Sequence, residues 1–329
     1  MRILITGAAG FIGFNFAQYL LKNSNHQIIG LDNLNNYYSP KYKSQRLNLI
    51  KKKKNFKFLK IDLKNKKKLI SIFKKWKPSI IYHLASQPGI MYSFKNPKTY
   101  ITNNISVTKN LIDISLKYKV KKFYFTSSSS VYGDKKKFPI KEKSKLKPIN
   151  IYAKTKKECE KILLKSFKNS NVDLKIFRPF TVYGPYARPD MIFITYMNKI
   201  LNKENFFLYN NGNYVRDFTY IDDVVEILSK FLKIEKLKYN IFNICSSKPV
   251  KIKKLIDMIN ANINHKPKLV LRPYRKGEMI KTYGCNKLIK KTLNFNKFTS
   301  LEYGIQKTIK WYQKFKNKNH LYFKKVRYK

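Results

Sequence analysis

The chain has 329 residues, 43% of them hydrophobic, which is enough to bury one large or two medium hydrophobic cores. It carries 71 Lys and Arg residues against 18 Asp and Glu, a formal net charge of +53, and the excess is mostly lysine spread along the whole chain. Because no stretch resembles a nucleic-acid-binding motif and no apolar run approaches transmembrane length, we expect neither specific nucleic-acid binding nor membrane insertion, only attraction of anionic ligands.

Short apolar runs alternate with helical patterns through the first half of the chain. The first strand, 3–6, precedes a helix whose apolar face carries Phe11, Phe14, Ala17 and Leu21 at helical spacing. Further strands are predicted at 27–31, 56–61, 79–84, 122–126 and 174–177, and further helices at 66–75, 98–118 and 151–168. This alternation predicts an α/β fold, a Rossmann-type doubly wound parallel sheet with helices on both faces.

The alternation stops after Gly184 and Pro185, where turn residues and short aromatic runs take over. Isolated helices are predicted at 251–262 and 301–315. A helix at 222–232 and a strand at 239–244 have the right character to cross back and extend the first sheet. The second half therefore predicts a smaller mixed α/β lobe beside the sheet.

The cysteines, Cys159, Cys245 and Cys285, are odd in number, far apart, and without the spacing of a metal site. The four histidines form no cluster, so we expect no bound metal. The chain opens directly on a strand-like run that is too short for the apolar region of a signal peptide. These features predict a reduced, cytoplasmic protein.

A glycine loop, Gly7-x-x-Gly10-x-x-Gly13, connects the first strand to the first helix. Glycines let the backbone turn tightly against a pyrophosphate, and the N-terminus of the following helix adds its dipole. Asp32 follows about 20 residues later, at the end of the second strand, where a carboxylate can bind the adenosine ribose and repel a 2′-phosphate. The combination predicts NAD as the cofactor.

These observations divide the chain. We predict an NAD-binding domain at 1–184, with residues 219–245 returning to it. The lobe at 185–329 is predicted to bind the substrate, and it ends in a basic tail of uncertain order at 316–329.

Tyr152 and Lys156 are four residues apart in a predicted helix, so a phenol and an ammonium lie on one face. Free tyrosine has a pKa of about 10 and is a poor base at neutral pH. A nearby cation favours the phenolate, and a pKa lower by about three units requires roughly 4 kcal/mol of differential stabilisation. We therefore expect Lys156, together with a positively charged ring, to lower the pKa of Tyr152.

Together, the glycine loop and the Tyr-x-x-x-Lys pair resemble the extended short-chain dehydrogenase/reductase family, and the resemblance extends to about residue 315. Segments that match its nucleotide-sugar epimerases and dehydratases are His83–Ala85, Asn104, Thr126–Gly133, Arg178–Pro185 and Arg216–Asp223. Segments similar to the members that act on UDP-glucuronate are Leu31–Tyr38, Ser127–Ser130 and Gly184–Met191.

The resemblance implies an isomerase that epimerises a UDP-sugar at C4. Tyr152 would take the proton from the sugar O4, and hydride would pass from C4 to a tightly held NAD⁺. The 4-keto sugar would turn and take the hydride back on its other face, with no net redox change. Lys156 would hold the nicotinamide ribose, and Ser128 would hydrogen-bond O4 and relay its proton.

The resemblance also implies two sets of binding residues. The cofactor set is Gly7, Gly10, Phe11, Ile12, Gly13, Asp32, Asn33, Asp62, Leu63, Leu84, Ala85, Asn104, Tyr152, Lys156 and Pro179. The substrate set is Ser128, Ser129, Thr181, Arg188, Arg216, Arg275 and Glu278. Asn104 is equally suited to tying a helix to a loop. Glu278 stands where the family usually has Asp, which puts its ribose contact in doubt.

Residue differences separate the related activities. Related 4,6-dehydratases need an Asp-Glu pair where this chain has Ser129 and Ser130, and UDP-glucuronate decarboxylases carry Glu at the second position. Hydroxyls cannot replace carboxylates as acids or bases near pH 7. Thr181 stands where UDP-galactose-type epimerases usually have Asn, and it leaves room for a C6 carboxylate. Arg188 has the planar fork that suits such a carboxylate, or it is a surface residue of a turn.

We therefore expect interconversion of UDP-glucuronate and UDP-galacturonate. The alternatives are a UDP-glucose/UDP-galactose 4-epimerase, a UDP-glucuronate decarboxylase, a catalytically silent NAD-binding regulatory protein and a basic nucleic-acid-binding module. The resemblance further implies a homodimer that pairs the helices carrying Asn104 and Tyr152.

Overall fold

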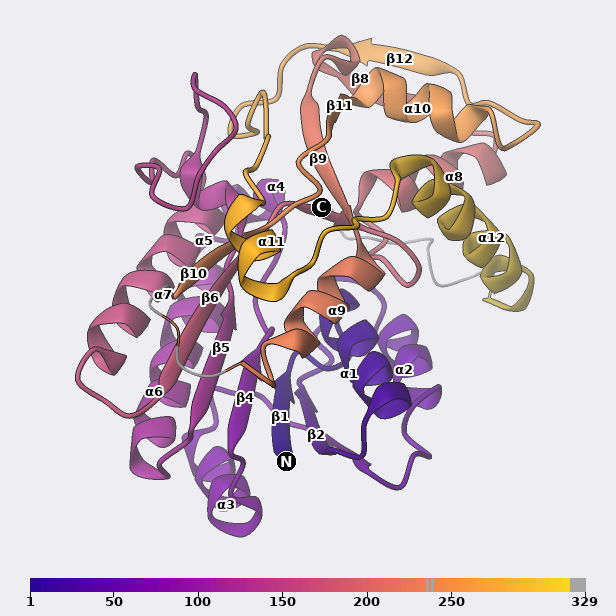
Figure 1. Ribbon diagram of the computed structural model, residues 1–329. Helices are drawn as coiled ribbons and strands as arrows, with labels where there is room; N and C mark the ends of the chain where they lie inside the picture. The colour runs from indigo at the N-terminus through magenta and orange to yellow at the C-terminus, as the bar shows by residue number, and fades with distance from the viewer. Residues whose placement is uncertain (235–236, 238–239, 320–329) are drawn as a thin grey trace.

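The computed structural model describes residues 1–234, 237 and 240–319, and its centre is a seven-stranded parallel sheet (Figure 1). The strands lie in the order β10-β6-β5-β4-β1-β2-β3. Their bounds are β1 Arg2–Thr6, β2 Gln27–Asp32, β3 Phe56–Lys60, β4 Ile80–His83, β5 Lys122–Thr126, β6 Asp173–Pro179 and β10 Ile241–Ile244. The predicted doubly wound parallel sheet is confirmed, and β10 pairs with β6 as its edge strand.

Helices cover both faces of the sheet because its strands are apolar on both sides. In β1, Ile3 and Ile5 contribute to one buried cluster and Leu4 to another, as the two-residue repeat of a strand requires. The first face is covered by α1 Phe11–Asn23, α2 Pro40–Asn48 and α9 Ile221–Lys230. The opposite face is covered by α3 Lys66–Trp76, α6 Val107–Lys117 and α7 Ile151–Phe167.

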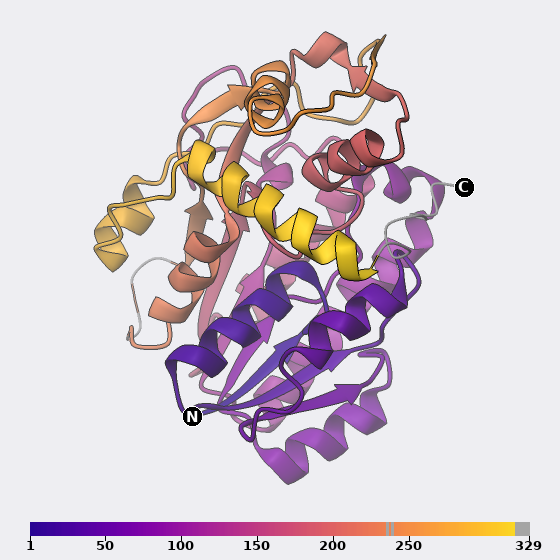
Figure 2. The same ribbon diagram turned by 90° about the vertical axis from the view of Figure 1, so that its right-hand side faces the viewer.

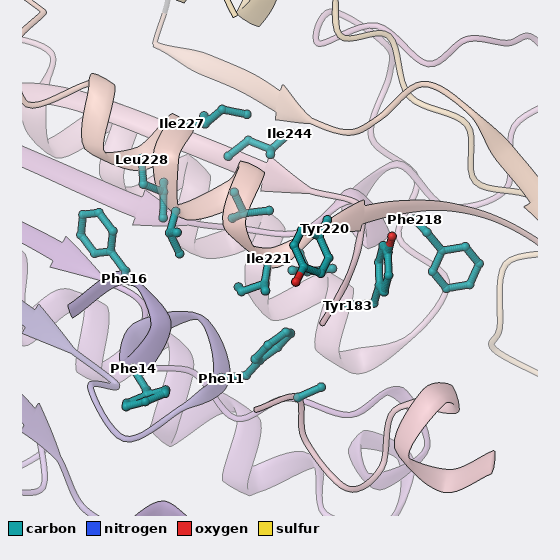
Figure 3. Close-up of a cluster of buried hydrophobic side chains, with 14 of the residues drawn as sticks. Phe11, Phe14, Phe16, Tyr183, Phe218, Tyr220, Ile221, Ile227, Leu228 and Ile244 are labelled. Carbon is teal, nitrogen blue, oxygen red and sulfur yellow. The ribbon is translucent and has the colours of Figure 1, made fainter. Parts of the chain in front are cut away.

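The buried cluster on the first face joins the sheet to the second lobe. Figure 3 shows Phe16 of α1 beside Leu228 of α9, and the cluster continues past Ile221 to the aromatic side chains of Tyr183, Tyr220 and Phe218. Tyr183 stacks nearly parallel to Phe193, with ring centroids 5.2 Å apart. One continuous core therefore holds both lobes around the carboxyl ends of the strands.

The predicted helix at 98–118 is divided in the structure. It consists of α5 Pro97–Tyr100, a π-helical turn at Ile101–Ser106 and α6, and it is preceded by α4 Ile90–Lys95. A π-helical turn inserts one residue and shifts the side chains that follow it, and such turns are common at functional sites. Here the turn carries Asn103 and Asn104.

The second lobe contains two small sheets and four helices (Figure 2). Strands β7 Thr181–Tyr183, β9 Val215–Tyr220 and β11 Pro249–Lys251 form one sheet, and β8 Phe206–Tyr209 pairs with β12 Leu269–Arg272. The helices are α8 Ile192–Leu201, α10 Ile252–Asn260, α11 Lys287–Leu293 and α12 Leu301–Asn319. Trp311 of α12 packs on Tyr186 with ring centroids 5.0 Å apart, so this helix lies against the loop after β7.

Two expectations stay open. The domain boundaries at 184 and 219–245 remain predictions. The predicted tail begins within α12, and from residue 320 it lies outside the described residues. Among the helices of the described residues, none combines the length and apolar composition needed to cross a membrane.

Candidate active site

The glycine loop between β1 and α1 packs closely against the carboxyl ends of the neighbouring strands. The Gly7 nitrogen donates to the Leu31 carbonyl at 2.7 Å, and Gly7 has a φ of +71°. A Cβ on Gly7 would lie 2.8 Å from the backbone of Ala85, and one on Gly13 would lie 2.1 Å from the Gly7 oxygen. Because no side chain fits at either position, both must be glycine. The loop then stays compact and its backbone stays open to a ligand.

Asp32 lies beside this loop at the end of β2. Its carboxylate accepts hydrogen bonds from the nitrogens of Ala9, at 3.1 Å, and Leu34, at 2.8 Å. These bonds hold it in the wall of a cavity that runs along the strand ends from Asp62 to Tyr152. A carboxylate next to a glycine cradle is the donor and acceptor set that suits an adenosine diphosphate with a free ribose 2′-hydroxyl.

Every residue predicted to bind the cofactor lines this cavity except Asn104. Asn104 is 2% exposed, and its amide oxygen accepts from the nitrogen of Gln87 at 2.7 Å. Its amide nitrogen donates to the hydroxyl of Thr155 at 3.0 Å. Asn104 therefore has the other role expected of it, that of tying a helix to a loop, while Asn103 lines the cavity. A cofactor contact of Asn104 stays a prediction.

The start of α7 positions the catalytic pair. The Asn150 side chain accepts from the Ala153 nitrogen at 2.8 Å, so the helix begins at Ile151 and Tyr152 lies in its first turn. One turn later the Lys156 ammonium donates to the Thr126 carbonyl at 2.8 Å. Both side chains line the cofactor cavity, as the four-residue spacing predicted.

Ser128 completes the group. It lies directly after β5, its side chain lines the cofactor cavity with Tyr152, and its hydroxyl donates to the Ser130 hydroxyl at 3.1 Å. The same hydroxyl accepts from the nitrogen of Ser130 at 3.2 Å, which fixes its direction. The predicted phenol, ammonium and hydroxyl are therefore brought together at one end of the cavity.

The pKa values of Tyr152 and Lys156 are set mainly by burial. Burial raises the pKa of Tyr152 above its ordinary value, although the Ser128 hydrogen bond and the Arg188 charge act in the opposite direction. Burial also lowers the pKa of Lys156 to about 8. In the protein alone, desolvation of the phenolate is the largest contribution to the pKa of Tyr152. The lowered tyrosine pKa stays a prediction for the protein with NAD⁺ bound, because it depends on the charged nicotinamide ring as well as on Lys156.

A second pocket opens from the cofactor cavity toward the smaller lobe. Tyr152, Thr181 and Arg188 line both spaces, so this is their junction. Arg216 and Arg275 line the far part of the second pocket.

Glu278 lies between these two arginines. Its carboxylate is 3.0 Å from the Arg275 guanidinium and 3.7 Å from that of Arg216. Two cations therefore share one anion, and the far part of the pocket keeps a net positive charge that suits a diphosphate.

A family model confirms the resemblance. Residues 3–245 match the model described as the NAD dependent epimerase/dehydratase family. The chain belongs to this family. The matched range contains the glycine loop, Asp32, Ser128, Tyr152 and Lys156, and the chain is an NAD-dependent enzyme of this family.

Relatives of this epimerase/dehydratase family extend the match to the second lobe. The UDP-glucuronate 4-epimerase of Thermodesulfobacterium geofontis is 35% identical over 94% of the chain and 95% of that protein. UDP-glucuronate 4-epimerase 4 of Arabidopsis thaliana is 33% identical over 95% of the chain and 75% of that protein. The crystal structure of the Bacillus cereus UDP-glucuronic acid 4-epimerase, with UDP-glucuronic acid and NAD, superposes with a TM-score of 0.90 at 30% identity over 96% of this chain and 100% of that one.

Ser129 was predicted to contact the substrate, but it does not line the substrate pocket. It is 8% exposed and begins the 3-10 turn Ser129–Tyr132, while Ser130 lines the substrate pocket. The Ser129 substrate contact stays a prediction, and Ser130 is the serine of this turn that lines the pocket.

Arg188 is paired within the protein. Its guanidinium binds both carboxylate oxygens of Asp190, at 2.9 and 3.0 Å, and the Tyr37 hydroxyl donates to Asp190 at 3.1 Å. Asp190 lines the substrate pocket and was missed from the sequence. Arg188, its ion-pair partner, lies only two residues earlier in the sequence. Tyr37, which donates a hydrogen bond to it, is 153 residues away along the chain.

The segment after β2 also contributes residues that the sequence analysis missed. Asn35, Tyr38 and Lys43 line the cofactor cavity near Asp32. The Lys43 ammonium donates to the Asn35 side chain at 2.7 Å, and burial lowers its pKa to about 8. Lys43 lies eleven residues after Asp32 in a lysine-rich stretch, so only its burial distinguishes it from the surface lysines.

Proposed function

We propose that the enzyme interconverts UDP-glucuronate and UDP-galacturonate by 4-epimerisation. The observation that carries the proposal is that Tyr152 lines both the cofactor cavity and the arginine-lined pocket, with Ser128 lining the cofactor cavity at the same end. A sugar held there has its C4 hydroxyl beside a proton acceptor and its ring against the cofactor cavity.

Tyr152, Ser128 and Lys156 have separate roles in this reaction. NAD supplies a hydride acceptor and donor when it is bound. Tyr152 accepts the O4 proton, and Ser128, at the same end of the cavity, holds O4 and moves the proton between them. The buried ammonium of Lys156, held by the Thr126 carbonyl, places a positive charge on the same helix face and favours the phenolate form of Tyr152, the form that accepts the proton.

The nucleotide half of the substrate belongs in the far part of the second pocket. Arg216 and Arg275 offer their guanidinium groups to the diphosphate, and Glu278 offers its carboxylate to the ribose hydroxyls. The Arg275 guanidinium also lies over the Tyr209 ring, 3.5 Å from its centroid, which fixes its plane. This grip leaves the sugar free to turn about the diphosphate after oxidation.

The carboxylate of the sugar would face Thr181, whose hydroxyl lies at the junction of the two spaces. Ser130 lines the same pocket with a second hydroxyl where decarboxylases carry Glu. With hydroxyls at Ser129 and Ser130, the chain lacks the carboxylic acid and carboxylate that the related dehydratases use at these two positions for elimination. Reversible oxidation at C4 is the chemistry that remains.

One observation favours a second candidate, 4-epimerisation of UDP-glucose and UDP-galactose. Arg188 is already neutralised by Asp190, so its charge is not fully available to a C6 carboxylate. A UDP-glucose 4-epimerase from Thermotoga maritima, crystallised with UDP-glucose, also superposes with a TM-score of 0.87 at 28% identity, over 96% of this chain and 99% of that one.

Incubation with UDP-glucuronate, followed by separation of the products, tests the proposal. We expect UDP-galacturonate and an equilibrium mixture approached from either side. UDP-xylose as the product would identify a decarboxylase. Turnover of UDP-glucose without turnover of UDP-glucuronate would identify the second candidate.

We further propose a homodimer that buries the outer surfaces of the helices carrying Asn104 and Tyr152. Large apolar side chains are exposed there: Ile101 by 50%, Leu116 by 40% and Leu164 by 37%. In Figure 1, α6 and α7 lie together on the outer flank of the sheet. Sedimentation equilibrium should give twice the chain mass, and Leu164→Lys should shift it toward the monomer; a monomeric wild type contradicts the proposal.

We also propose a cytoplasmic location. Cys159, Cys245 and Cys285 are buried free thiols, as expected of a protein that folds under reducing conditions. Fractionation of the source cells with an antibody against the chain would test it, and recovery of the protein outside the cytoplasmic fraction would contradict it.

A further inference from the structure

One buried arginine contacts the backbone of both binding segments. Arg46 of α2 is 1% exposed. One terminal nitrogen donates to the Ala9 carbonyl at 3.0 Å and to the Tyr38 hydroxyl at 2.6 Å. The other donates to the carbonyls of Tyr186, at 2.5 Å, and Ala187, at 3.3 Å. A single rigid, planar group therefore connects two loops that are more than 170 residues apart in the chain.

The first of these loops binds the cofactor. Ala9 lies within the glycine loop, and its own nitrogen donates to the Asp32 carboxylate. The Ala9 carbonyl therefore moves only if the loop and its ribose-binding carboxylate move with it. A cofactor that orders the glycine loop also fixes the position of Arg46.

The second loop belongs to the substrate pocket. Ala187 directly precedes Arg188, which lines both the cofactor cavity and the substrate pocket. The Tyr42 hydroxyl donates to the same Ala187 carbonyl at 3.0 Å, and Tyr37 holds Asp190, the partner of Arg188. The segment after β2 thus faces the cofactor on one side and the Arg188 loop on the other.

The two terminal nitrogens of the Arg46 guanidinium are bound by neutral groups, while its Nε is buried without a hydrogen-bond partner among the described residues. It lies over the Tyr42 ring at 4.1 Å from the centroid and over the Tyr38 ring at 5.4 Å. Within the part of the chain that the structure describes, no salt bridge between Arg46 and a carboxylate occurs. Its charge therefore depends on the two sets of backbone carbonyls, and displacement of either loop leaves part of a buried cation without acceptors.

We propose that Arg46 is a positioning residue that couples NAD binding to UDP-sugar binding. An ordered glycine loop holds Arg46, which holds the 186–187 carbonyls and with them Arg188 at the mouth of the substrate pocket. The coupling is reciprocal, so a nucleotide in the substrate pocket also tightens NAD binding. The inference rests on the proposed function, because UDP is assigned to that pocket.

Release of NAD from the holoenzyme tests the coupling. The bound cofactor is exchanged against an excess of isotope-labelled NAD, with and without saturating UDP. In the wild-type protein UDP should slow the exchange at least about fivefold, the lower end of typical coupling between sites. In Arg46→Lys, which keeps the charge but cannot reach both loops, the effect of UDP should fall to within about twofold of none.

Arg178→Lys is the matched control. Arg178 is also buried, at 2% exposure, but its guanidinium binds Glu160, Tyr132 and the Glu142 carbonyl, which belong to neither loop. This variant should lose stability and keep the wild-type effect of UDP. An Arg46→Lys protein with the wild-type effect would overturn the proposal, because UDP then slows NAD release only by covering its exit.

Two further outcomes are decisive. If Arg46→Lys does not fold by circular dichroism, the Tyr42→Phe protein takes its place. It loses one donor to the Ala187 carbonyl, so the effect of UDP should fall at least about twofold, and an unchanged effect would overturn the proposal.

Wild-type protein that turns over UDP-glucuronate but exchanges NAD equally fast with and without UDP refutes the coupling alone. Protein that neither binds UDP nor turns over UDP-sugars refutes the proposed function as well.

Discussion

Replacement of Lys156 by methionine should stabilise the fold while it removes activity. Lys156 is 3% exposed, and burial lowers the pKa of its ammonium to about 8 from an ordinary 10.5. Since one pKa unit corresponds to about 1.4 kcal/mol, keeping this group charged inside the fold costs about 3 kcal/mol at pH 7. Methionine has a similar length and no charge, so the variant avoids this cost.

The gain is partly offset by the lost hydrogen bond. The Lys156 ammonium donates to the Thr126 carbonyl at 2.8 Å, and a buried carbonyl without a donor costs about 1–3 kcal/mol. We therefore expect Lys156→Met to be more stable than the wild type by about 1–2 kcal/mol at pH 7. Turnover should be lost, because the charge that favours the Tyr152 phenolate is gone.

The pH dependence gives the sign of the effect. Because the folded pKa is lower than the unfolded one, the cost is fully present below pH 8. Between about pH 8 and 10.5 the folded protein releases the proton that the unfolded chain keeps, so wild-type stability rises with pH relative to the variant. The advantage of Lys156→Met should therefore shrink over this range.

Urea unfolding at pH 7 and at pH 9.5 measures both effects. The proteins are first freed of NAD, because a ligand that binds only the folded state adds its own stabilisation. Lys154→Met, on the exposed face of the same helix, is the control and should change stability by less than about 0.5 kcal/mol. A Lys156→Met protein that is less stable than the wild type at pH 7, or an advantage that grows with pH, would refute the reasoning.

Three further substitutions test the substrate site. Tyr152→Phe should lower kcat by about 10²–10⁴-fold while NAD still co-purifies, and undiminished turnover would remove Tyr152 from its role. Asp190→Asn should free the charge of Arg188 and raise the kcat/KM ratio of UDP-glucuronate to UDP-glucose about tenfold, equal to about 1.4 kcal/mol; an unchanged ratio means that Arg188 does not contact the sugar carboxylate. Thr181→Asn should lower the same ratio about 2- to 10-fold, the value of one hydrogen bond, and constant kinetics would show that Thr181 does not distinguish the two sugars.

Local spacing made much of the fold and catalytic group predictable. The glycine loop needed only three positions next to a strand, and the Tyr152–Lys156 pair needed only the repeat of an α-helix. In both cases the residues that determine the geometry are neighbours in the chain. Ser128 followed from the resemblance to the family, and its place at the end of a strand agrees with the rule that functional side chains of a parallel sheet gather at the carboxyl ends of the strands.

The predicted and observed cavity-lining residues differ where the path of the backbone decides which side chain faces the cavity. Asn104 lies in a π-helical turn and Ser129 in a 3-10 turn, and in each case the adjacent residue, Asn103 or Ser130, lines the cavity. The sequence does not show which of two adjacent residues faces the cavity, because Asn103 and Asn104 have identical side chains, as do Ser129 and Ser130. The contacts of Arg46 were hidden for another reason, since its acceptors are backbone carbonyls that any residue would provide.

Charge pairing explains why so basic a chain keeps a selective site. Only 18 residues are acidic, yet Glu160, Asp190 and Glu278 are each placed against an arginine in or behind the two binding spaces. Many of the lysines lie on the exposed surface, where solvent and salt screen them. Since Glu278 balances one of two guanidinium groups and Asp190 balances Arg188 fully, the uncompensated charge is greatest in the far part of the substrate pocket. The positive field of the surface therefore attracts any anion, whereas the balance of charge inside the pocket selects a diphosphate and leaves the choice of sugar to the hydroxyls at its junction with the cofactor cavity.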